Sequence, residues 1–281
     1  MDNPKTISTS GGDVKYWVYN PGKAKTIVMI HGFTGDHFGF QKIIPLLPNY
    51  TLIVPDLPGS GISDLPPKKY WSIDALAALA NEFVKNLQLP EPPIIFGHSM
   101  GGLVVASMVH QAPELYDKKV ILLSPVPAKI SLTDSRWLGA RLGELQYLAG
   151  YRLPKLGPKI AASKTLTKWI ANQLITTKDK AVIRFTYEQM WQNLSYISSL
   201  EYYYRLEQDI NRRGAIDYAD TLREKDLLII NGDIDRVVPL NKLQPLVQAT
   251  GANFTLIEGV GHDAHYEKPA EVARIVNAFL A

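Results

Sequence analysis

Four short runs of apolar residues constrain the fold of this chain more than any other feature. The runs are TIVMI from Thr26, PIIF from Pro93, KVILL from Lys119 and DLLII from Asp226. None of them alternates apolar and polar residues, and such continuous runs are typical of strands that are covered on both faces. Segments with helical spacing separate most of them. The chain is therefore predicted to form an α/β fold around a parallel central sheet.

The expected strands are short and bounded by turn residues. They cover residues 14–20, 26–31, 51–56, 94–98, 120–124, 227–232 and 253–257. The SGGD turn that starts at Ser10 predicts an antiparallel hairpin near the N-terminus. Helices are expected after Ser72, which is predicted to cap one, and over residues 103–111, 241–250 and 269–280.

The alternation of strands and helices breaks between residues 127 and 222. This stretch predicts helices only, over residues 137–149, 164–175, 180–194 and 196–208. Because a single sheet domain rarely contains so long a stretch without strands, we interpret residues 127–222 as a helical cap, or lid, domain. Residues 1–126 and 223–281 would then form the core domain. The alternative is that these helices are simply more scaffold.

Composition and net charge indicate where in the cell the protein is expected and which kinds of partner are not expected. No apolar run approaches the roughly 18 residues of a membrane span. The N-terminal residues lack the features of a secretory signal, and the chain contains no cysteine. These observations favour a cytoplasmic protein. The formal net charge of +3 gives no indication of nucleic-acid binding.

The sequence GHSMG places Ser99 where an expected strand turns sharply into an expected helix. Such a turn is strained and requires small neighbours, which Gly97 and Gly101 supply. The turn would lift the Ser99 hydroxyl above the carboxyl edge of the sheet. It would also place the backbone N–H of Met100 at a helix N-terminus, where negative charge is stabilised. An incidental match in a loop is the alternative, but the flanking strand and helix patterns favour a nucleophile.

Three motifs in this order, HGFTG from His31, GHSMGG from Gly97 and GVGHDAHYEKP from Gly259, resemble the α/β-hydrolase superfamily. The chain is similar to serine hydrolases of the carboxylesterase and monoacylglycerol-lipase type, and the resemblance is weakest over residues 127–222. It implies an eight-stranded, mostly parallel central sheet flanked by helices. It also implies an all-helical cap inserted after strand six. No cofactor is expected.

A serine nucleophile requires a base and a third group that orients the base. Of the six histidines, His262 and His265 follow the last expected strand, so both could reach the carboxyl edge of the sheet. In similar sequences the base directly follows the glycine, which favours His262 and gives His265 a supporting role beside Glu267. His31 and His98 lie in glycine turns, where a structural hydrogen-bonding role is expected.

The orienting acid is expected after a strand as well, and NGDIDRVVP offers Asp233 and Asp235. The pattern of the resembling family is a glycine, two residues, then the aspartate, with a proline four residues further on. This pattern favours Asp235, and Asp233 is then expected to make local bonds in a turn. The resulting order of Ser99, Asp235 and His262 is the order expected on this fold.

The resemblance also implies an oxyanion hole, which needs a second backbone donor. It puts this donor at Phe33, opposite Met100, in the glycine turn that includes Gly32. His98 and Gly32 are expected to support the substrate site. Asp56, in the loop VPDLPGSGISD, is expected to act in turn formation.

These residues predict a serine hydrolase that cleaves carboxylic esters through an acyl-enzyme. The expected substrates are small-molecule esters with small to medium acyl chains or a lipid-like character. The same triad also serves C–C bond hydrolases and menaquinone-pathway lyases. Leu103 stands where those lyases usually carry arginine, and Asp263 stands where many C–C hydrolases carry tryptophan. A non-catalytic receptor on the same fold is an alternative of another class. No metal is expected, because a catalytic triad explains the two histidines of HDAH better than a pair of metal ligands does.

The expected cap carries more Lys and Arg than Asp and Glu, with the excess between residues 136 and 168. This charge could steer anionic substrates or give weak contact with acidic lipid surfaces, and an ordinary solvated face is the alternative. Most aromatic residues of the cap are expected to pack in its core, and a minority to line an apolar cleft.

Overall fold

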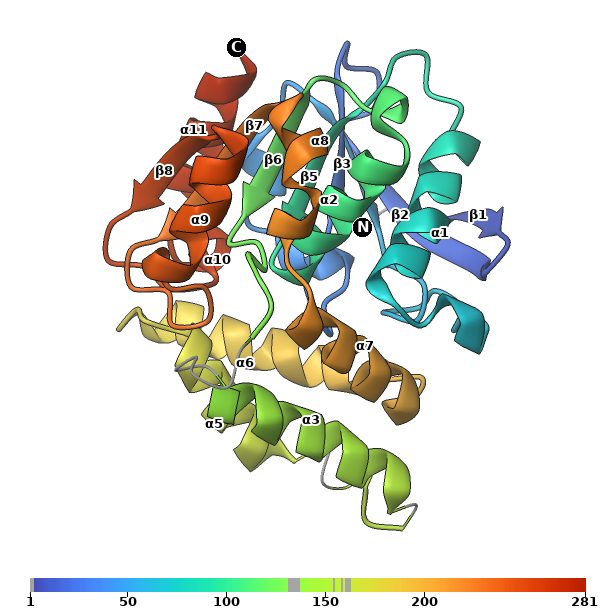
Figure 1. Cartoon of the computed structure of the whole chain (residues 1–281), viewed down its shortest axis with the longest axis vertical. Coiled ribbons are helices and arrows are strands. Elements are labelled where there is room, and N and C mark those ends of the chain that lie inside the picture. Colours follow the sequence, from blue (N-terminus) through green and yellow to red (C-terminus); the bar gives the residue numbers. More distant parts are fainter. Residues whose placement is uncertain (1–2, 131–136, 154, 158, 160–162) are drawn as a thin grey trace.

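The computed structural model of the chain describes residues 3–130, 137–153, 155–157, 159 and 163–281. Helices flank a central sheet, and a separate group of helices lies beyond one end of it (Figure 1). The strands are β1 (Lys5–Thr9), β2 (Gly12–Tyr19), β3 (Thr26–Ile30), β4 (Thr51–Pro55), β5 (Ile94–His98), β6 (Lys119–Leu123), β7 (Asp226–Gly232) and β8 (Asn253–Ile257). These strands confirm the predicted α/β class.

The eight strands form one sheet in the order β1-β2-β4-β3-β5-β6-β7-β8. β1 pairs with β2 and β2 with β4 in antiparallel fashion, and all pairs from β4 to β8 are parallel. The predicted N-terminal hairpin is therefore present, with β1 as the strand that the seven predicted runs did not include. The carboxyl ends of six parallel strands consequently lie along one edge, where ligands bind in folds of this kind.

Both faces of the sheet are covered, which explains the continuous apolar runs. On one face of the sheet, Val28 and Ile30 of β3 belong to a core cluster that also includes residues of α1 (Ile73–Asn86), α2 (Met100–Gln111), α8 (Ala219–Arg223) and α9 (Leu240–Thr250). Their neighbours Ile27 and Met29 belong to the cluster on the other face, together with residues of α11 (Pro269–Leu280) and of the short helices His37–Phe40 and Ile44–Leu46. Because successive strand residues point to opposite faces, each residue of the run must be apolar.

Four of the helices described between β6 and β7 are referred to below as the helical insertion. They are α3 (Trp137–Arg152), α5 (Lys164–Leu174), α6 (Lys180–Ser195) and α7 (Leu200–Arg212), and they form the group beyond the sheet in Figure 1, whereas α8 lies beside the sheet. α7 starts four residues later than predicted because the Ser199 hydroxyl caps it by accepting from the N–H of Tyr202 at 3.2 Å. Parts of the basic stretch from residue 136 to residue 168 lie outside the described residues.

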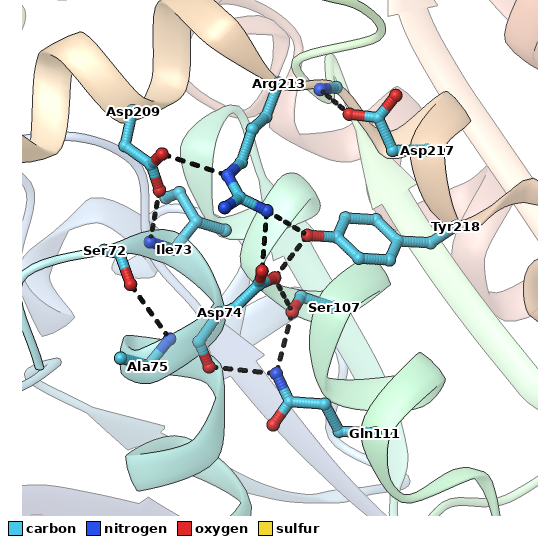
Figure 2. A network of polar contacts seen from close by, with 11 residues as sticks. Ser72, Ile73, Asp74, Ala75, Ser107, Gln111, Asp209, Arg213, Asp217 and Tyr218 are labelled. Carbon is cyan, nitrogen blue, oxygen red and sulfur yellow. Dashed lines mark hydrogen bonds and ion pairs between the residues drawn. The ribbon is translucent and has the colours of Figure 1, made fainter.

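Two kinds of contact attach the helical insertion to the sheet domain. The buried hydroxyl of Tyr202 in α7 donates to the carbonyl of Pro58 at 2.9 Å. Arg213, which directly follows α7, bonds Asp209 at 3.0 Å and Asp74 of α1 at 2.6 Å, within the polar network shown in Figure 2. The predicted cap at Ser72 is confirmed, since its hydroxyl accepts from the first turn of α1.

Within the described part of the chain, the helices are all too short or too polar to cross a membrane.

Candidate active site

Ser99 occupies a strained backbone position between β5 and α2. Its φ of 55° and ψ of −119° fall in a region that residues with side chains rarely adopt. A Cβ on Gly97 would lie 2.4 Å from the carbonyl oxygen of Gly101, and a Cβ on Gly101 would lie 2.2 Å from that of Ile30. Both positions therefore require glycine. α2 begins at Met100, earlier than predicted, so the backbone N–H of Met100 lies at its first turn.

Two hydrogen bonds connect Ser99, His262 and Asp235. The Nε2 of His262 lies 2.8 Å from the Oγ of Ser99, and its Nδ1 lies 2.9 Å from the Oδ2 of Asp235. The other carboxylate oxygen of Asp235 accepts from the backbone N–H groups of Val237 and Val238, each at 2.8 Å. With both of its oxygens engaged, the carboxylate fixes the orientation of the imidazole.

Asp235 and His262 are both buried, and their electrostatic attraction outweighs that burial. Burial raises the pKa of Asp235, but the charge and hydrogen bond of His262, with the two backbone N–H groups, lower it below its usual value. Burial likewise lowers the pKa of His262, whereas the attraction of Asp235 and Asp263 raises it above its usual 6.5. The pair is therefore arranged to stabilise a proton on the imidazole.

Ser99 and His262 open onto a cavity of about 740 Å³ between the sheet edge and the helical insertion. Phe33 and Met100, the two predicted oxyanion donors, also line this cavity. The Phe33 ring makes an edge contact with Tyr147 of α3, with the ring centroids 5.7 Å apart. A Cβ on Gly32 would lie 3.3 Å from that of Ser99, so the HGFTG turn passes directly beside the serine.

His98, Asp263 and His265 form a buried cluster behind His262. Their nitrogen and carboxylate atoms lie within 4.8 Å of one another, which makes them the group among the described residues that could hold a metal ion. Burial lowers the pKa of His98 to about 3, and burial raises that of Asp263 to about 6. The ring centroids of His98 and His265 lie 4.2 Å apart. The Nε2 of His98 lies 3.3 Å from the carbonyl oxygen of His262. The two neutral imidazoles thus pack beneath the loop that carries His262.

Two neighbouring carboxylates make contacts that the sequence did not indicate. Glu267 accepts from the hydroxyl and the backbone N–H of Thr176, which lies between α5 and α6. Asp233 accepts from the N–H of Gly259 at 2.7 Å, a contact between two loops and not a local turn bond. Both contacts join segments that lie far apart in the sequence, which a local pattern does not specify.

Asp56 is fully buried and has a larger role than turn formation. Its carboxylate accepts from the N–H of Ile62 at 3.0 Å, which is the expected bond within the turn. It also lies 2.9 Å from the Nδ1 of His37, whose ring stacks on Trp17. The nearby His31 accepts from the N–H of Leu57 at 2.9 Å, in the structural role predicted for it.

Sequence reasoning missed the polar residues with which the helical insertion lines the cavity. They include Gln189 and Asn193 of α6 and Glu207 of α7. Thr186, Gln189, Met190 and Asn193 recur at intervals of one to three residues along one face of α6, and this spacing is a signal that could have indicated a lining face. Of the aromatic residues, Tyr147 and Trp169 border the cavity, while Tyr202 and Tyr203 are buried in packing.

The sheet order, the strained serine turn and the loops that converge on it define an α/β protein of the hydrolase type. Residues 25–269 match the family described as alpha/beta hydrolase fold. This match spans most of the chain, and the protein belongs to that family.

Relatives of known sequence include proteins named as hydrolases or lipases. The chain is 38% identical over 122 residues to "Uncharacterized hydrolase YugF" of Bacillus subtilis, covering 43% of this chain and 44% of that protein. It is 28% identical over 278 residues to "Monoacylglycerol lipase ABHD6" of Bos taurus, covering 93% of this chain and 77% of that protein. The match to "Lipase 3" of Moraxella sp. is 30% identical and covers 39% of this chain and 35% of that protein. The chain thus matches less than half the length of two of these three relatives.

Solved structures share the fold over nearly the whole chain. A thermophilic esterase from Thermogutta terrifontis has a TM-score of 0.77 at 20% identity, covering 99% of this chain and 98% of the other. A bromoperoxidase from Bacillus anthracis has a TM-score of 0.80 at 17% identity, covering 99% of both chains. At such identities the likeness concerns the fold alone.

Proposed function

We propose that this protein is a serine hydrolase that cleaves carboxylic esters. Ser99 would act as the nucleophile, His262 as the general base and Asp235 as the acid that orients it. The observation that carries this proposal is the continuous pair of hydrogen bonds, 2.8 Å and 2.9 Å long, that ends on Ser99. The serine also lines a cavity large enough for a small-molecule ester.

The reaction would proceed in two halves. The Ser99 oxygen attacks the ester carbonyl carbon while its proton passes to the Nε2 of His262, and the resulting oxyanion accepts from the N–H groups of Phe33 and Met100. The tetrahedral intermediate then expels the alcohol, which takes the proton from His262. In the second half, His262 removes a proton from water as the water attacks the acyl-enzyme, and the acid is released with Ser99 regenerated.

The relatives support ester hydrolysis as the chemistry. Two of them are named as lipases, and structures that share the fold include esterases from Thermogutta terrifontis and Exiguobacterium antarcticum. Small to medium acyl chains or lipid-like esters are the substrates that we propose. The chain matches only part of several relatives, so their substrates serve here as a guide to the class of bond.

We also propose that residues 127–222 form a cap domain over a core of residues 1–126 and 223–281. The helices α3, α5, α6 and α7 contribute much of the cavity lining, with Leu142, Trp169 and Met190 among the apolar side chains. The substrate would therefore lie between core and cap. Selectivity would depend on the cap, because the catalytic residues all come from the core.

The alternative chemistries of this fold receive less support. Leu103 is buried and apolar, so it offers no charge to a substrate carboxylate as an arginine would in a lyase. Asp263, where many C–C hydrolases carry tryptophan, is a small charged residue of the cavity lining. A non-catalytic receptor would not need the hydrogen bond between His262 and Ser99, and ester hydrolysis uses it directly.

Turnover of p-nitrophenyl esters of increasing chain length tests the proposal. Ser99→Ala should reduce turnover by about a million-fold, as loss of the nucleophile does in other triads. Ser195→Ala is the matched control, because the Ser195 hydroxyl is exposed and bonds only the carbonyl of Gln192 among the contacts described for it. Hydrolysis that persists undiminished in Ser99→Ala would reject Ser99 as the nucleophile.

A further inference from the structure

One wall of the cavity carries acceptor oxygens that have no hydrogen-bond partner in the part of the chain that the structure describes. Gln189 of α6 is only 7% exposed and lines the cavity, and its Oε1 has no hydrogen-bond partner among the described residues. The Oδ1 of Asn193, one turn further along the helix, is in the same situation. Buried acceptors are rarely left unpaired in proteins, so this wall is suited to a ligand that donates hydrogen bonds.

Glu207 of α7 adds a third oxygen to the same cavity. Its Oε2 is buried and has no partner among the residues that the structure describes. Gly143 of α3 lies against this carboxyl group, since a Cβ there would be 2.2 Å from the Oε1 of Glu207. The glycine therefore leaves room for the carboxyl group between α3 and α7.

The charge state of Glu207 indicates the kind of donor that fits. Burial, with a smaller contribution from the charge of Glu144, raises the pKa of Glu207 to about 8. Glu144 itself is paired with Arg141 and accepts from the side chain of Asn211 at 2.9 Å. At neutral pH the Glu207 carboxyl group is therefore protonated, and the part of the cavity lining that Gln189, Asn193 and Glu207 contribute, called the wall below, is polar but uncharged.

A neutral wall of this composition matches a hydroxyl group. A hydroxyl can donate its one hydrogen to the free oxygen of Gln189 or of Asn193 and can accept from the protonated carboxyl group of Glu207. An ammonium group would require an ionised partner, and a carboxylate would face the acceptor oxygens of Gln189 and Asn193. A methyl group in the same place would leave the buried acceptors unpaired, which is how polar pockets reject apolar analogues.

We propose that Gln189, Asn193 and Glu207 bind a hydroxyl group of the substrate, so that the protein selects hydroxyl-bearing esters over apolar esters of the same size. This inference rests on the proposed function, because the hydroxyl group must belong to an ester that is cleaved at Ser99. The hydroxyl can be carried by the alcohol part or by the acyl part of the ester.

Two matched pairs of esters test the selectivity and separate these two sources. 2-Hydroxyethyl butyrate and propyl butyrate differ by one hydroxyl in place of a methyl group in the alcohol part. Methyl 6-hydroxyhexanoate and methyl heptanoate differ in the same way in the acyl part. We expect kcat/KM to favour the hydroxylated member by about tenfold in one pair, mainly through a lower KM. Equal rates within both pairs, or preference for the apolar member, would overturn the inference while leaving ester hydrolysis intact.

Substitutions at Gln189 and Glu207 test whether these residues cause the preference for hydroxylated esters. Gln189→Leu and Glu207→Met remove the oxygens at similar size, and each should reduce the hydroxyl preference several-fold. Glu207→Gln should retain it, because a neutral amide resembles the protonated carboxyl group. Gln192→Leu makes the same change as Gln189→Leu on the same helix, outside the cavity lining, and should also retain the preference.

Circular dichroism and melting curves would confirm that each variant is folded before its preference is compared. A preference that survives in both folded Gln189→Leu and folded Glu207→Met would contradict the role of this wall. If the wild-type protein hydrolyses none of the four esters and Ser99 is not labelled by a fluorophosphonate, the proposed function fails, and the inference fails with it.

Discussion

The Nε2 of His262 lies 2.8 Å from the Oγ of Ser99, although 163 positions separate these residues in the chain. Ser99 follows β5 and His262 follows β8, and two further strands lie between β5 and β8 in the sheet. The loop after β8 must therefore reach back across the carboxyl edge. Asp235, which follows the intervening β7, holds the imidazole in that position.

Asp235→Asn should lower kcat by about 10⁴-fold, because an amide stabilises the wrong tautomer of His262. The acid limb of the kcat/KM profile should also move to lower pH. His262 must be neutral to act as a base, and Asp235 raises its pKa above 6.5, so activity of the wild type is lost as pH falls through that raised value. Removing the carboxylate charge lowers this pKa. The pH dependence of ester hydrolysis measures both effects.

Asp233→Asn is the matched control for this variant. The Asp233 carboxylate accepts only from the N–H of Gly259 among its described contacts, and an asparagine oxygen can preserve that bond. Its pH profile should overlay that of the wild type. An acid limb that moves in Asp233→Asn but stays in place in Asp235→Asn would contradict the assignment of Asp235.

The two histidines of the last loop should differ sharply in their effect on chemistry. His262→Ala removes the group that contacts Ser99 and should reduce turnover by about a million-fold. His265→Ala leaves that contact in place, because the His265 ring packs on His98 at 4.2 Å. It should mainly reduce stability, by about 1–3 kcal/mol, as the loss of a packed buried side chain does. Equal activity of His262→Ala and the wild type would transfer the base to His265.

Gly101→Ala should destabilise the fold as well as the site. The added Cβ would lie 2.2 Å from the backbone carbonyl of Ile30, and backbone atoms of a central strand cannot move aside cheaply. We expect the free energy of unfolding in urea to fall by at least about 2 kcal/mol. At Gly39 the nearest atom to an added Cβ is the hydroxyl of Tyr266 at 3.6 Å, so Gly39→Ala should change stability little. A Gly101→Ala protein as stable as the wild type would contradict this picture of the turn.

The Asp74 network in Figure 2 should make stability depend on acid pH. Burial raises the pKa of Asp74, but hydrogen bonds from Tyr218 and Ser107, with the charge of Arg213, bring it below its usual 3.8. Stability from this carboxylate is therefore present above pH 3.8 and is lost as pH falls through the lowered value. Asp74→Asn should be less stable than the wild type at pH 7, and the difference should shrink below about pH 4. Urea titrations of both proteins across this range would show it, and a difference independent of pH would contradict it.

Much of the fold could be predicted because the runs in β3, β5, β6 and β7 are continuous and apolar. The antiparallel β1 was indicated only by its turn, since the exposed strand KTIST has no apolar pattern. The observed helix boundaries differ from the predicted ones where a capping side chain sets the first residue of the helix, as Ser199 does for α7. The helical insertion was predicted from its lack of strands, but spacing alone could not indicate which faces would turn toward the sheet.

For the candidate site, motifs located Ser99, Asp235 and His262 because each follows a strand at a recognisable turn. The acceptor oxygens of Gln189 and Glu207 were missed because they lie on helices whose rotation is set by packing, of α6 against α5 and of α7 against α3. The spacing along α6 marks a common face, but it does not say what that face meets. The cluster of His98 and His265 was likewise visible only once β5 and the last loop lay side by side.

Mass spectrometry of the protein after treatment with a fluorophosphonate tests the central claim most directly. We predict one covalent adduct per chain, on the peptide that contains Ser99, with labelling abolished in Ser99→Ala and strongly slowed in His262→Ala. Labelling of a different serine, or labelling of Ser99 at an undiminished rate in folded His262→Ala, would contradict a triad formed by Ser99, His262 and Asp235.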